Sequence, residues 1–289
     1  MPTVLPNTPS AAAPVGEAEL RPAEFDEISR TVIAVAGIQL REGKEGLVRS
    51  RLARRLRQLG LASYGAYLER TRGAAGAAER AHMVDLLTTN KTSFFRESAH
   101  FDLLRSRVLP EFGAAPGGFR VWSAGCSTGE EPYTLAMVLG DTLAEPARRQ
   151  ARILATDISA RVLERARAGV YTDEQVEGVP PELLRRHFTR RAAAPNDGGA
   201  PGWSAGPGLR EPVRFAPLNL MGAWPMRGPF HAIFCRNVMI YFDKPTQATL
   251  VARFHELLVP GGYLFVGHSE SLSAVGHAFA YVQPAVYRK

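Results

Sequence analysis

Trp122-Ser123-Ala124-Gly125-Cys126-Ser127-Thr128-Gly129-Glu130-Glu131-Pro132 is the stretch that decides the fold of this chain. A short apolar run from Phe119 to Ala124 leads into it, and an amphipathic stretch from Glu131 to about Leu143 follows it. This order predicts a strand, a turn of small residues and a helix. Small residues let a ligand approach the backbone, and the first turn of a helix offers free N–H groups. The turn is therefore a candidate ligand site.

Short apolar runs and amphipathic stretches keep alternating toward the C-terminus. Further strands are predicted at 152–156, 213–217, 230–234 and 262–266. Further helices are predicted from about 160 and over 246–258. This alternation is typical of an α/β domain whose mostly parallel sheet is covered on both faces. We expect 280–287 to add a final edge strand.

One segment between these strands has no apolar period. Residues 192–208 contain five glycines and three prolines. Glycine raises the entropic cost of ordering a chain, and proline removes a backbone donor. We expect a loop without regular structure here, inside a small insertion of about 180–212.

The N-terminal third has a different pattern. Residues 1–20 are rich in alanine and proline, which predicts a disordered tail. Apolar residues then recur at helical spacing, for example Val48, Leu52 and Leu56, and predict a small all-helical domain over 21–96. A linker and helix at 97–118 would lead to the α/β domain at 119–289.

Composition excludes membrane-spanning and disulfide-rich classes of protein. No stretch approaches the ~18 consecutive apolar residues of a membrane span, and the first residues lack the basic and apolar regions of a secretory signal. The two cysteines, Cys126 and Cys235, are too few for a disulfide framework or a thiolate zinc site. We therefore expect a protein of the reducing cytoplasm that is neither exported nor inserted in a membrane.

The formal net charge of +7 is unevenly placed along the chain. Seven basic and two acidic residues lie between Arg41 and Arg57, so this segment alone carries +7 − 2 = +5. A basic patch can bind nucleic acid or an acidic protein. Only four of the 35 basic residues are lysines, however, and an excess of arginine can reflect genome composition alone.

A second strand end points to a nucleoside cofactor. Asp157 closes the strand that follows the first helix, and an acidic side chain at that place can accept hydrogen bonds from both ribose hydroxyls. This signal is weak alone, because the turn lacks the full Gly-x-Gly-x-x-Gly of dinucleotide enzymes. An ordinary strand-to-helix turn is an equally good interpretation.

Three further segments make the pattern specific. They are Thr89-Asn90-Lys91-Thr92-Ser93-Phe94-Phe95-Arg96-Glu97, Phe234-Cys235-Arg236-Asn237-Val238-Met239-Ile240-Tyr241-Phe242 and Gly267-His268-Ser269-Glu270-Ser271. Together with the turn and the strand end, they closely resemble the chemotaxis receptor methyltransferases of the CheR family, from about residue 25 to the C-terminus. The resemblance implies a helical domain that precedes a Rossmann-like methyltransferase domain. It also implies that S-adenosylmethionine donates methyl groups to receptor glutamates, with S-adenosylhomocysteine as product.

The resemblance further implies which residues hold the cofactor. Asp157 would bind the ribose, and Asn219-Leu220 would border the adenine, although Asn219 by itself would be assigned to capping a turn. Whether Glu130 or Glu131 faces the ligand stays open. The full implied set is Asn90, Thr92, Arg96, Ala124, Glu130, Asp157, Asn219, Leu220, Arg236 and Asn237.

Catalysis would fall to two polar residues. Methyl transfer to a carboxylate needs no strong base, because a glutamate with a pKa of about 4.3 is already ionised at neutral pH. We expect Arg96 to orient the carboxylate and Tyr241 to position it or the cofactor, while a tyrosine packed at a strand end is the simpler interpretation of Tyr241. We expect no metal site. His268-Ser269 lacks the Gly-x-Ser-x-Gly turn of a hydrolase.

Substrate docking would fall to a basic helix face. Arg51, Arg54 and Arg57 lie broadly opposite the apolar stripe of their helix, which usually indicates a solvated face. The methylation regions of chemotaxis receptors are acidic helical coiled coils, so the resemblance implies that these arginines dock them. We expect a monomer with no nucleic-acid partner, and methylation that does not need the receptor's C-terminal peptide to be tethered to the insertion. An S-adenosylmethionine-dependent RNA methyltransferase and a catalytically silent, cofactor-binding adaptor are the rival functions.

Overall fold

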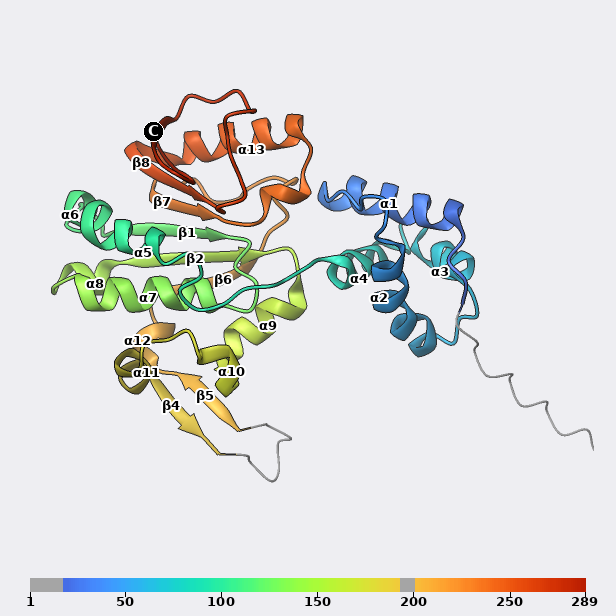
Figure 1. Ribbon diagram of the computed structural model, residues 1–289, viewed down its shortest axis with the longest axis horizontal. Helices are drawn as coiled ribbons and strands as arrows, with labels where there is room; N and C mark the ends of the chain where they lie inside the picture. Colours follow the sequence, from blue (N-terminus) through green and yellow to red (C-terminus); the bar gives the residue numbers. More distant parts are fainter. Residues whose placement is uncertain (1–17, 193–200) are drawn as a thin grey trace, which may run out of the picture. The chain divides into compact units, whose positions relative to one another are not determined.

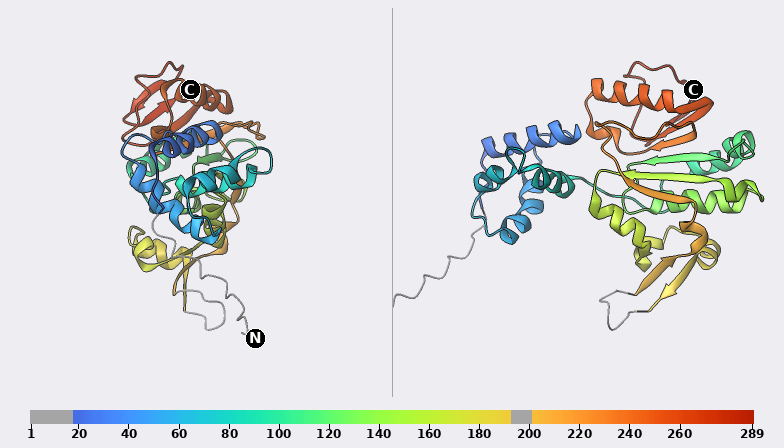
Figure 2. Two further views of the ribbon diagram at one scale, coloured as in Figure 1. Left: turned by 90° about the vertical axis from the view of Figure 1, so that its right-hand side faces the viewer. Right: turned by 180° about the vertical axis from the view of Figure 1, so that it is seen from behind.

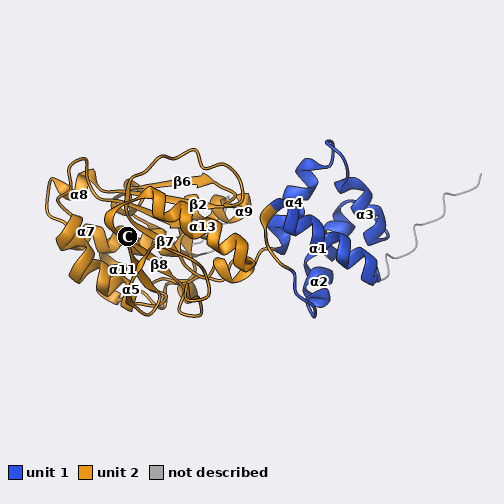
Figure 3. Ribbon diagram, turned by 90° about the horizontal axis from the view of Figure 1, so that it is seen from above, with its two compact units in different colours: residues 1–35, 40–87 blue, residues 36–39, 88–289 orange. Residues whose placement is uncertain are grey.

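The structure is a computed structural model that describes residues 18–192 and 201–289. The chain forms two compact units (Figure 3). The first ends at Leu87, and the second runs from Thr88 to Lys289 and includes Ala36–Gln39. The segment 88–96, expected in the helical domain, thus groups with the second unit. The predicted tail lies outside the described residues up to position 17.

The first unit is built from helices. They are α1 (Pro22–Ala36), α2 (Glu45–Gln58), α3 (Tyr64–Thr71) and α4 (Ala77–Leu87). Helix α2 buries Val48, Leu52 and Leu56, as its apolar spacing predicts. No helix in the described part of the chain is long and apolar enough to cross a membrane.

A seven-stranded sheet forms the centre of the second unit, in the order β6-β2-β1-β7-β8-β10-β9 (Figure 1). The strands are β1 (Arg120–Ala124), β2 (Arg152–Asp157), β6 (Val213–Pro217), β7 (Phe230–Cys235), β8 (Leu258–Val266), β9 (Ala280–Gln283) and β10 (Val286–Arg288). Strands β6, β2, β1, β7 and β8 are parallel, and β10 pairs antiparallel with both β8 and β9. This mostly parallel sheet confirms the predicted α/β fold. The order reverses between β1 and β7, where open α/β sheets bind ligands beyond the carboxyl ends of their strands.

Alternate residues of the strands face two separate cores. Val121 and Phe234 belong to the core that contains the apolar face of α7, whereas Trp122 and Ile233 belong to the core that contains α13. Figure 2 shows from behind how helices flank this sheet. The helices of this unit outside the insertion are α5 (Ala99–Leu103), its π-helical continuation η1 (Leu104–Val108), α6 (Leu109–Phe112), α7 (Glu130–Thr142), α8 (Ala147–Gln150), α9 (Ala160–Ala168), the 3-10 helix η2 (Met239–Tyr241) and α13 (Lys244–Leu257).

The insertion begins at β3, about ten residues before the predicted start at 180, and contains more regular structure than its sequence predicts. It comprises β3 (Val170–Tyr171), α10 (Asp173–Val176), α11 (Pro181–His187), β4 (Phe188–Arg191), β5 (Gly202–Ala205) and α12 (Pro207–Arg210). The strands form a separate antiparallel sheet in the order β3-β5-β4. The expectation that 192–208 holds no element is therefore wrong for β5 and for the start of α12, while 193–200 lie outside the described residues.

A tryptophan explains why β5 forms among glycines and prolines. The Trp203 indole N–H donates to Asp173 at 2.8 Å, and the Arg190 guanidinium lies 5.1 Å from the Trp203 ring centroid. These contacts tie β5 to α10 and to the neighbouring strand β4. The extended closing strand predicted at 280–287 is likewise two strands, because Ala285 turns the chain with a φ of +62°.

Candidate active site

The turn after β1 is held against neighbouring segments. The N–H groups of Gly125 and Cys126 both donate to the carbonyl of Thr156, at 2.8 and 2.9 Å. Gly125 has a φ of +88°, and a Cβ there would lie 2.4 Å from Cγ2 of Val238, so glycine is required. The turn therefore packs against the end of β2 and the loop after β7.

Asp157 supports this turn from the end of β2. Its Oδ2 accepts the N–H of Ser127 and its Oδ1 accepts the N–H of Ser159, each at 2.9 Å. Ser127 has a φ of +49°, which is uncommon outside glycine, so the carboxylate stabilises a costly backbone conformation. Each carboxylate oxygen has further acceptor capacity. Asp157 can therefore organise the turn and still bind a ribose.

Glu130 and Glu131 begin α7 and face different surroundings. Glu130 accepts the hydroxyl of Thr128 at 2.6 Å and the side-chain amide of Gln175 at 3.4 Å. Glu131 instead accepts the hydroxyl of Ser123 at 2.7 Å and pairs with Arg236 at 2.9 Å. Burial raises the pKa of both carboxyls, against the effect of these partners. Glu130 is thus the glutamate that lines a pocket.

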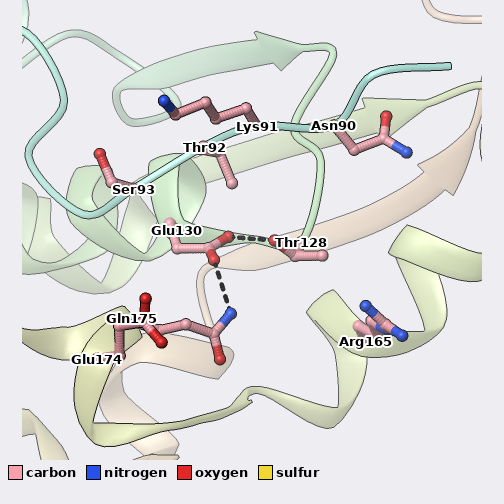
Figure 4. A pocket seen from close by; sticks show the side chains of 9 residues that line it. All are labelled: Asn90, Lys91, Thr92, Ser93, Thr128, Glu130, Arg165, Glu174 and Gln175. Carbon is pink, nitrogen blue, oxygen red and sulfur yellow. Dashed lines mark hydrogen bonds between the residues drawn. The ribbon is translucent and has the colours of Figure 1, made fainter. Parts of the chain in front are cut away.

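This pocket has a volume of about 400 Å³, within the range of small-molecule sites. Figure 4 shows Asn90 and Thr92 on one side of Glu130, and Gln175 and Arg165 on the other. The residues that line it are Asn90, Lys91, Thr92, Ser93, Thr128, Glu130, Arg165, Glu174 and Gln175. The structure therefore brings together three residues that the sequence predicts for the cofactor, from segments far apart in the chain.

Several residues of the pocket were not predicted. Thr128 lies within the decisive turn and was open to prediction from the motif. Glu174 and Gln175 come from α10 of the insertion, and Arg165 comes from α9, where the sequence carries no cofactor signal. A hydrogen bond of 2.8 Å from the Ser127 hydroxyl to the Asn90 carbonyl ties the turn to the opposite wall.

Arg236 lies in a buried ion-pair network beneath the turn. It contacts Glu97 at 3.1 Å and Glu131 at 2.9 Å, donates to the carbonyl of Arg96, and lies 5.4 Å from the ring centroid of Phe101. Although burial opposes ionisation of Glu97, Arg236 holds the pKa of that carboxyl below its usual range. The Arg236 side chain is 2% exposed and does not line the pocket. It stabilises the segments around the pocket through its ion pairs with Glu97 and Glu131.

The two expected catalytic residues are half-buried and lie outside the lining of the pocket in Figure 4. The Arg96 guanidinium donates to the carbonyl of Lys91 at 2.9 Å, which holds it beside the segment that forms one pocket wall. Tyr241 ends η2, and its carbonyl accepts the N–H of Gln39 at 2.9 Å. Neither side chain lines the pocket, and their catalytic roles stay predictions.

The other expected cofactor residues follow strand ends. Asn219 accepts the N–H of Met221 at 3.0 Å, so its side chain does cap a turn. Leu220 is buried, and its carbonyl accepts from Trp224 at 3.1 Å and from Arg253 at 2.9 Å. The Ala124 side chain is buried in the core with α13 and leaves only its backbone for a ligand.

A group with potential metal ligands was not predicted from the sequence. Glu97, His100 and His268 each offer a ligand atom, and these atoms lie within 4.8 Å of one another. Burial, with the charge of Arg236, lowers the pKa of His100 to about 4, so its imidazole is neutral at pH 7. The Glu97 carboxylate already pairs with Arg236, and a guanidinium at 3.1 Å opposes a second cation. We therefore interpret this group as part of the ion-pair network.

Comparison with known proteins agrees with this architecture. Residues 90–287 match the family described as CheR methyltransferase, SAM binding domain, and residues 23–88 match CheR methyltransferase, all-alpha domain. The chain is 44% identical over 269 residues to the chemotaxis protein methyltransferase of Klebsiella aerogenes, which covers 93% of this chain and 90% of the relative. It is 41% identical over 290 residues to chemotaxis protein methyltransferase 2 of Pseudomonas aeruginosa, which covers 99% of each. The chain therefore belongs to the CheR methyltransferase family, and its second unit contains the family's S-adenosylmethionine-binding domain.

Proposed function

We propose that this chain transfers the methyl group of S-adenosylmethionine to glutamate side chains of chemotaxis receptors, in the cytoplasm. The observation that carries the proposal is the pocket that Thr128 and Glu130 line after β1, in the domain that matches the family's S-adenosylmethionine-binding domain. The names of the relatives supply the chemotaxis context. Asp157 would bind the ribose, and Glu130 with Asn90 and Thr92 would face other polar groups of the cofactor.

The reaction needs alignment more than acid or base. A carboxylate oxygen forms a bond to the methyl carbon while the carbon–sulfur bond breaks, and sulfur keeps the electron pair. The negative carboxylate and the positive sulfonium are both neutralised, so the transition state is less polar than the reactants. Exclusion of water should help, and alignment can supply up to about 7–11 kcal/mol in favourable cases.

A labelling experiment separates the proposal from its rivals. The chain is incubated with methyl-tritiated S-adenosylmethionine and membranes that contain chemotaxis receptors. Receptor label that alkali releases as methanol is expected, because a methyl ester hydrolyses in base. Alkali-stable label in added RNA would indicate an RNA methyltransferase. Cofactor binding without any transfer would indicate an adaptor.

Arg96→Ala is expected to lower the initial rate of receptor methylation by on the order of 100-fold, as misplacement by ~1 Å can. A tight guanidinium contact would stabilise the charged reactant more than the less polar transition state. We therefore expect Arg96 to orient the carboxylate without binding it tightly, and not to act as an acid. Arg96→Lys keeps the charge without the planar fork and should recover only part of the rate. A near-normal rate for Arg96→Ala would remove Arg96 from the reaction.

The basic face of α2 is less uniform than the sequence suggests. Arg54 and Arg57 are exposed, whereas Arg51 is half-buried and donates to the Leu86 carbonyl at 3.4 Å. Arg55 pairs with Glu79 at 2.6 Å and so belongs to the fold of the first unit. Arg54 and Arg57 are thus the best-placed arginines to dock an acidic receptor helix.

Reversing Arg51, Arg54 and Arg57 to glutamate is expected to raise the receptor KM several-fold at low salt and to leave cofactor affinity unchanged. Exposed charges act collectively and are screened, so the difference should shrink as salt rises. Arg54→Glu with Arg57→Glu isolates the exposed pair. The control is Arg148→Glu with Arg149→Glu, which changes the net charge by the same amount. These arginines lie on α8, which precedes the amino end of β2, whereas Asp157 lies at its carboxyl end. Equal KM values for the two double variants would count against docking.

One strand edge in the insertion bears on our expectation that methylation does not need the receptor's C-terminal peptide to be tethered. That expectation rests on a loop that cannot present a strand edge, but β4 in the described part of the insertion is paired on one side only, with β5. Open strand edges can accept an added peptide strand. Independence from the tail peptide is still proposed on the glycine and proline content of the insertion. Receptors with and without the tail belong in the assay.

A further inference from the structure

The loop after β8 contains a buried carboxylate that the proposed chemistry does not use. Glu270 is 7% exposed. Its Oε2 accepts the N–H of Asn237 at 2.8 Å and the N–H of Gly267, and its Oε1 accepts the N–H of Ile240 at 3.1 Å. One side chain therefore joins the loop after β8 to the turn after β7.

The turn after β7 needs such support. Asn237 has a φ of +59°, and η2 is a single 3-10 turn whose first N–H groups have no partner within the helix. A backbone of this kind persists only when its surroundings hold it. Glu270 satisfies two N–H groups of the turn, one at Asn237 and one at Ile240, the residue immediately before Tyr241.

The two loops also pack closely against each other. A Cβ on Gly267 would lie 2.3 Å from Nδ2 of Asn237, so only glycine allows this approach. On the other side, Glu97 accepts from the Asn237 side-chain amide at 3.4 Å and from the His268 N–H at 3.3 Å. Asn237 is thus fixed between two carboxylates, and Tyr241 lies one short helical turn beyond it.

We infer that Glu270 is a positioning residue for methyl transfer, which acts by fixing the turn that carries Asn237 and Tyr241. The inference rests on the proposed function, because Tyr241 is the residue whose placement it would set. Glu270 lies behind the backbone of the turn and need not touch substrate or cofactor. Its effect on rate should therefore pass through Tyr241.

A double-mutant cycle tests this route. Glu270→Gln keeps the size of the side chain but replaces one acceptor oxygen with an NH₂ group, which then faces a backbone N–H. Glu270→Gln is expected to lower kcat by about 10-fold or more, since small misplacements reduce rates strongly. In a Tyr241→Phe background the same change should lower kcat less than about 3-fold, because coupled residues are not additive.

The controls separate a positioning role from general stability. Glu256→Gln, an exposed change on α13, should leave kcat unaltered. If Glu270→Gln melts below the assay temperature, Glu270→Asp keeps the charge and completes the same cycle. Equal factors in both backgrounds, or a normal kcat for a folded Glu270 variant, would overturn the inference. Absence of receptor label with the parent chain would instead overturn the proposed function.

Discussion

Asp157→Ala is expected to weaken binding of S-adenosylmethionine by roughly 10- to 140-fold. A hydrogen bond to a charged group contributes about 1.5–3 kcal/mol, and each 1.4 kcal/mol is tenfold in affinity. The alanine variant loses the proposed ribose contact. It also leaves the N–H groups of Ser127 and Ser159 without the acceptor that holds the turn.

Calorimetric titration of the cofactor measures this effect directly. Asp157→Asn is the matched variant, because one side-chain oxygen can still accept while the other acceptor becomes a donor. Its affinity should lie between those of the parent and Asp157→Ala. Unchanged affinity in the alanine variant would remove Asp157 from the cofactor site.

Arg236→Met is expected to lower the free energy of unfolding by about 3–5 kcal/mol, the usual result of removing one partner of a buried ion pair. The change leaves Glu97 and Glu131 with negative charges that no longer have their guanidinium partner. Denaturant titration at neutral pH provides the measurement. Adding Glu131→Gln should recover part of the loss, because the amide needs no counter-charge.

The deficit of Arg236→Met should also depend on pH. Burial already raises the pKa of Glu131 in the folded chain, and removal of Arg236 removes a group that lowers it. A carboxyl whose pKa is raised by folding contributes most stability below its unfolded pKa of about 4.3 and loses that contribution as pH rises through the folded value. The variant should therefore lie closest to the parent at acid pH. A pH-independent deficit would argue against unpaired carboxylates as its cause.

Local sequence was sufficient to predict the parts of the site that lie next to strand ends. The turn at 125–129 and Asp157 are each encoded in a few consecutive residues. Asn90, between α4 and α5, was predicted only from the family resemblance. The choice between Glu130 and Glu131 was not encoded locally, because adjacent helical residues differ in direction by about 100° and only tertiary partners decide which one faces a ligand. Arg236 pairs with Glu131, 105 residues away in sequence, while Glu130 lines the pocket.

The insertion shows the limit of composition as evidence. Glycine and proline predict irregular structure, yet the strand Gly202–Ala205 forms because Trp203 finds partners in α10 and β4. Gln175 reaches the pocket from α10 of the same insertion, where its side-chain amide donates to Glu130 at 3.4 Å. Neither contact has a local sequence signature.

The order of the strands has a consequence for biosynthesis. Strand β1 pairs with β2 on one side and with β7 on the other, and Val121 lies opposite Ala232, 232 − 121 = 111 residues later. At about 5–20 residues per second, a ribosome needs roughly 6–22 s to add those residues. During that interval a nascent chain has an open β1 edge, of the kind that recruits other strands. The ligand-binding edge of the sheet, between the carboxyl ends of β1 and β7, can form only after Arg236 has been translated.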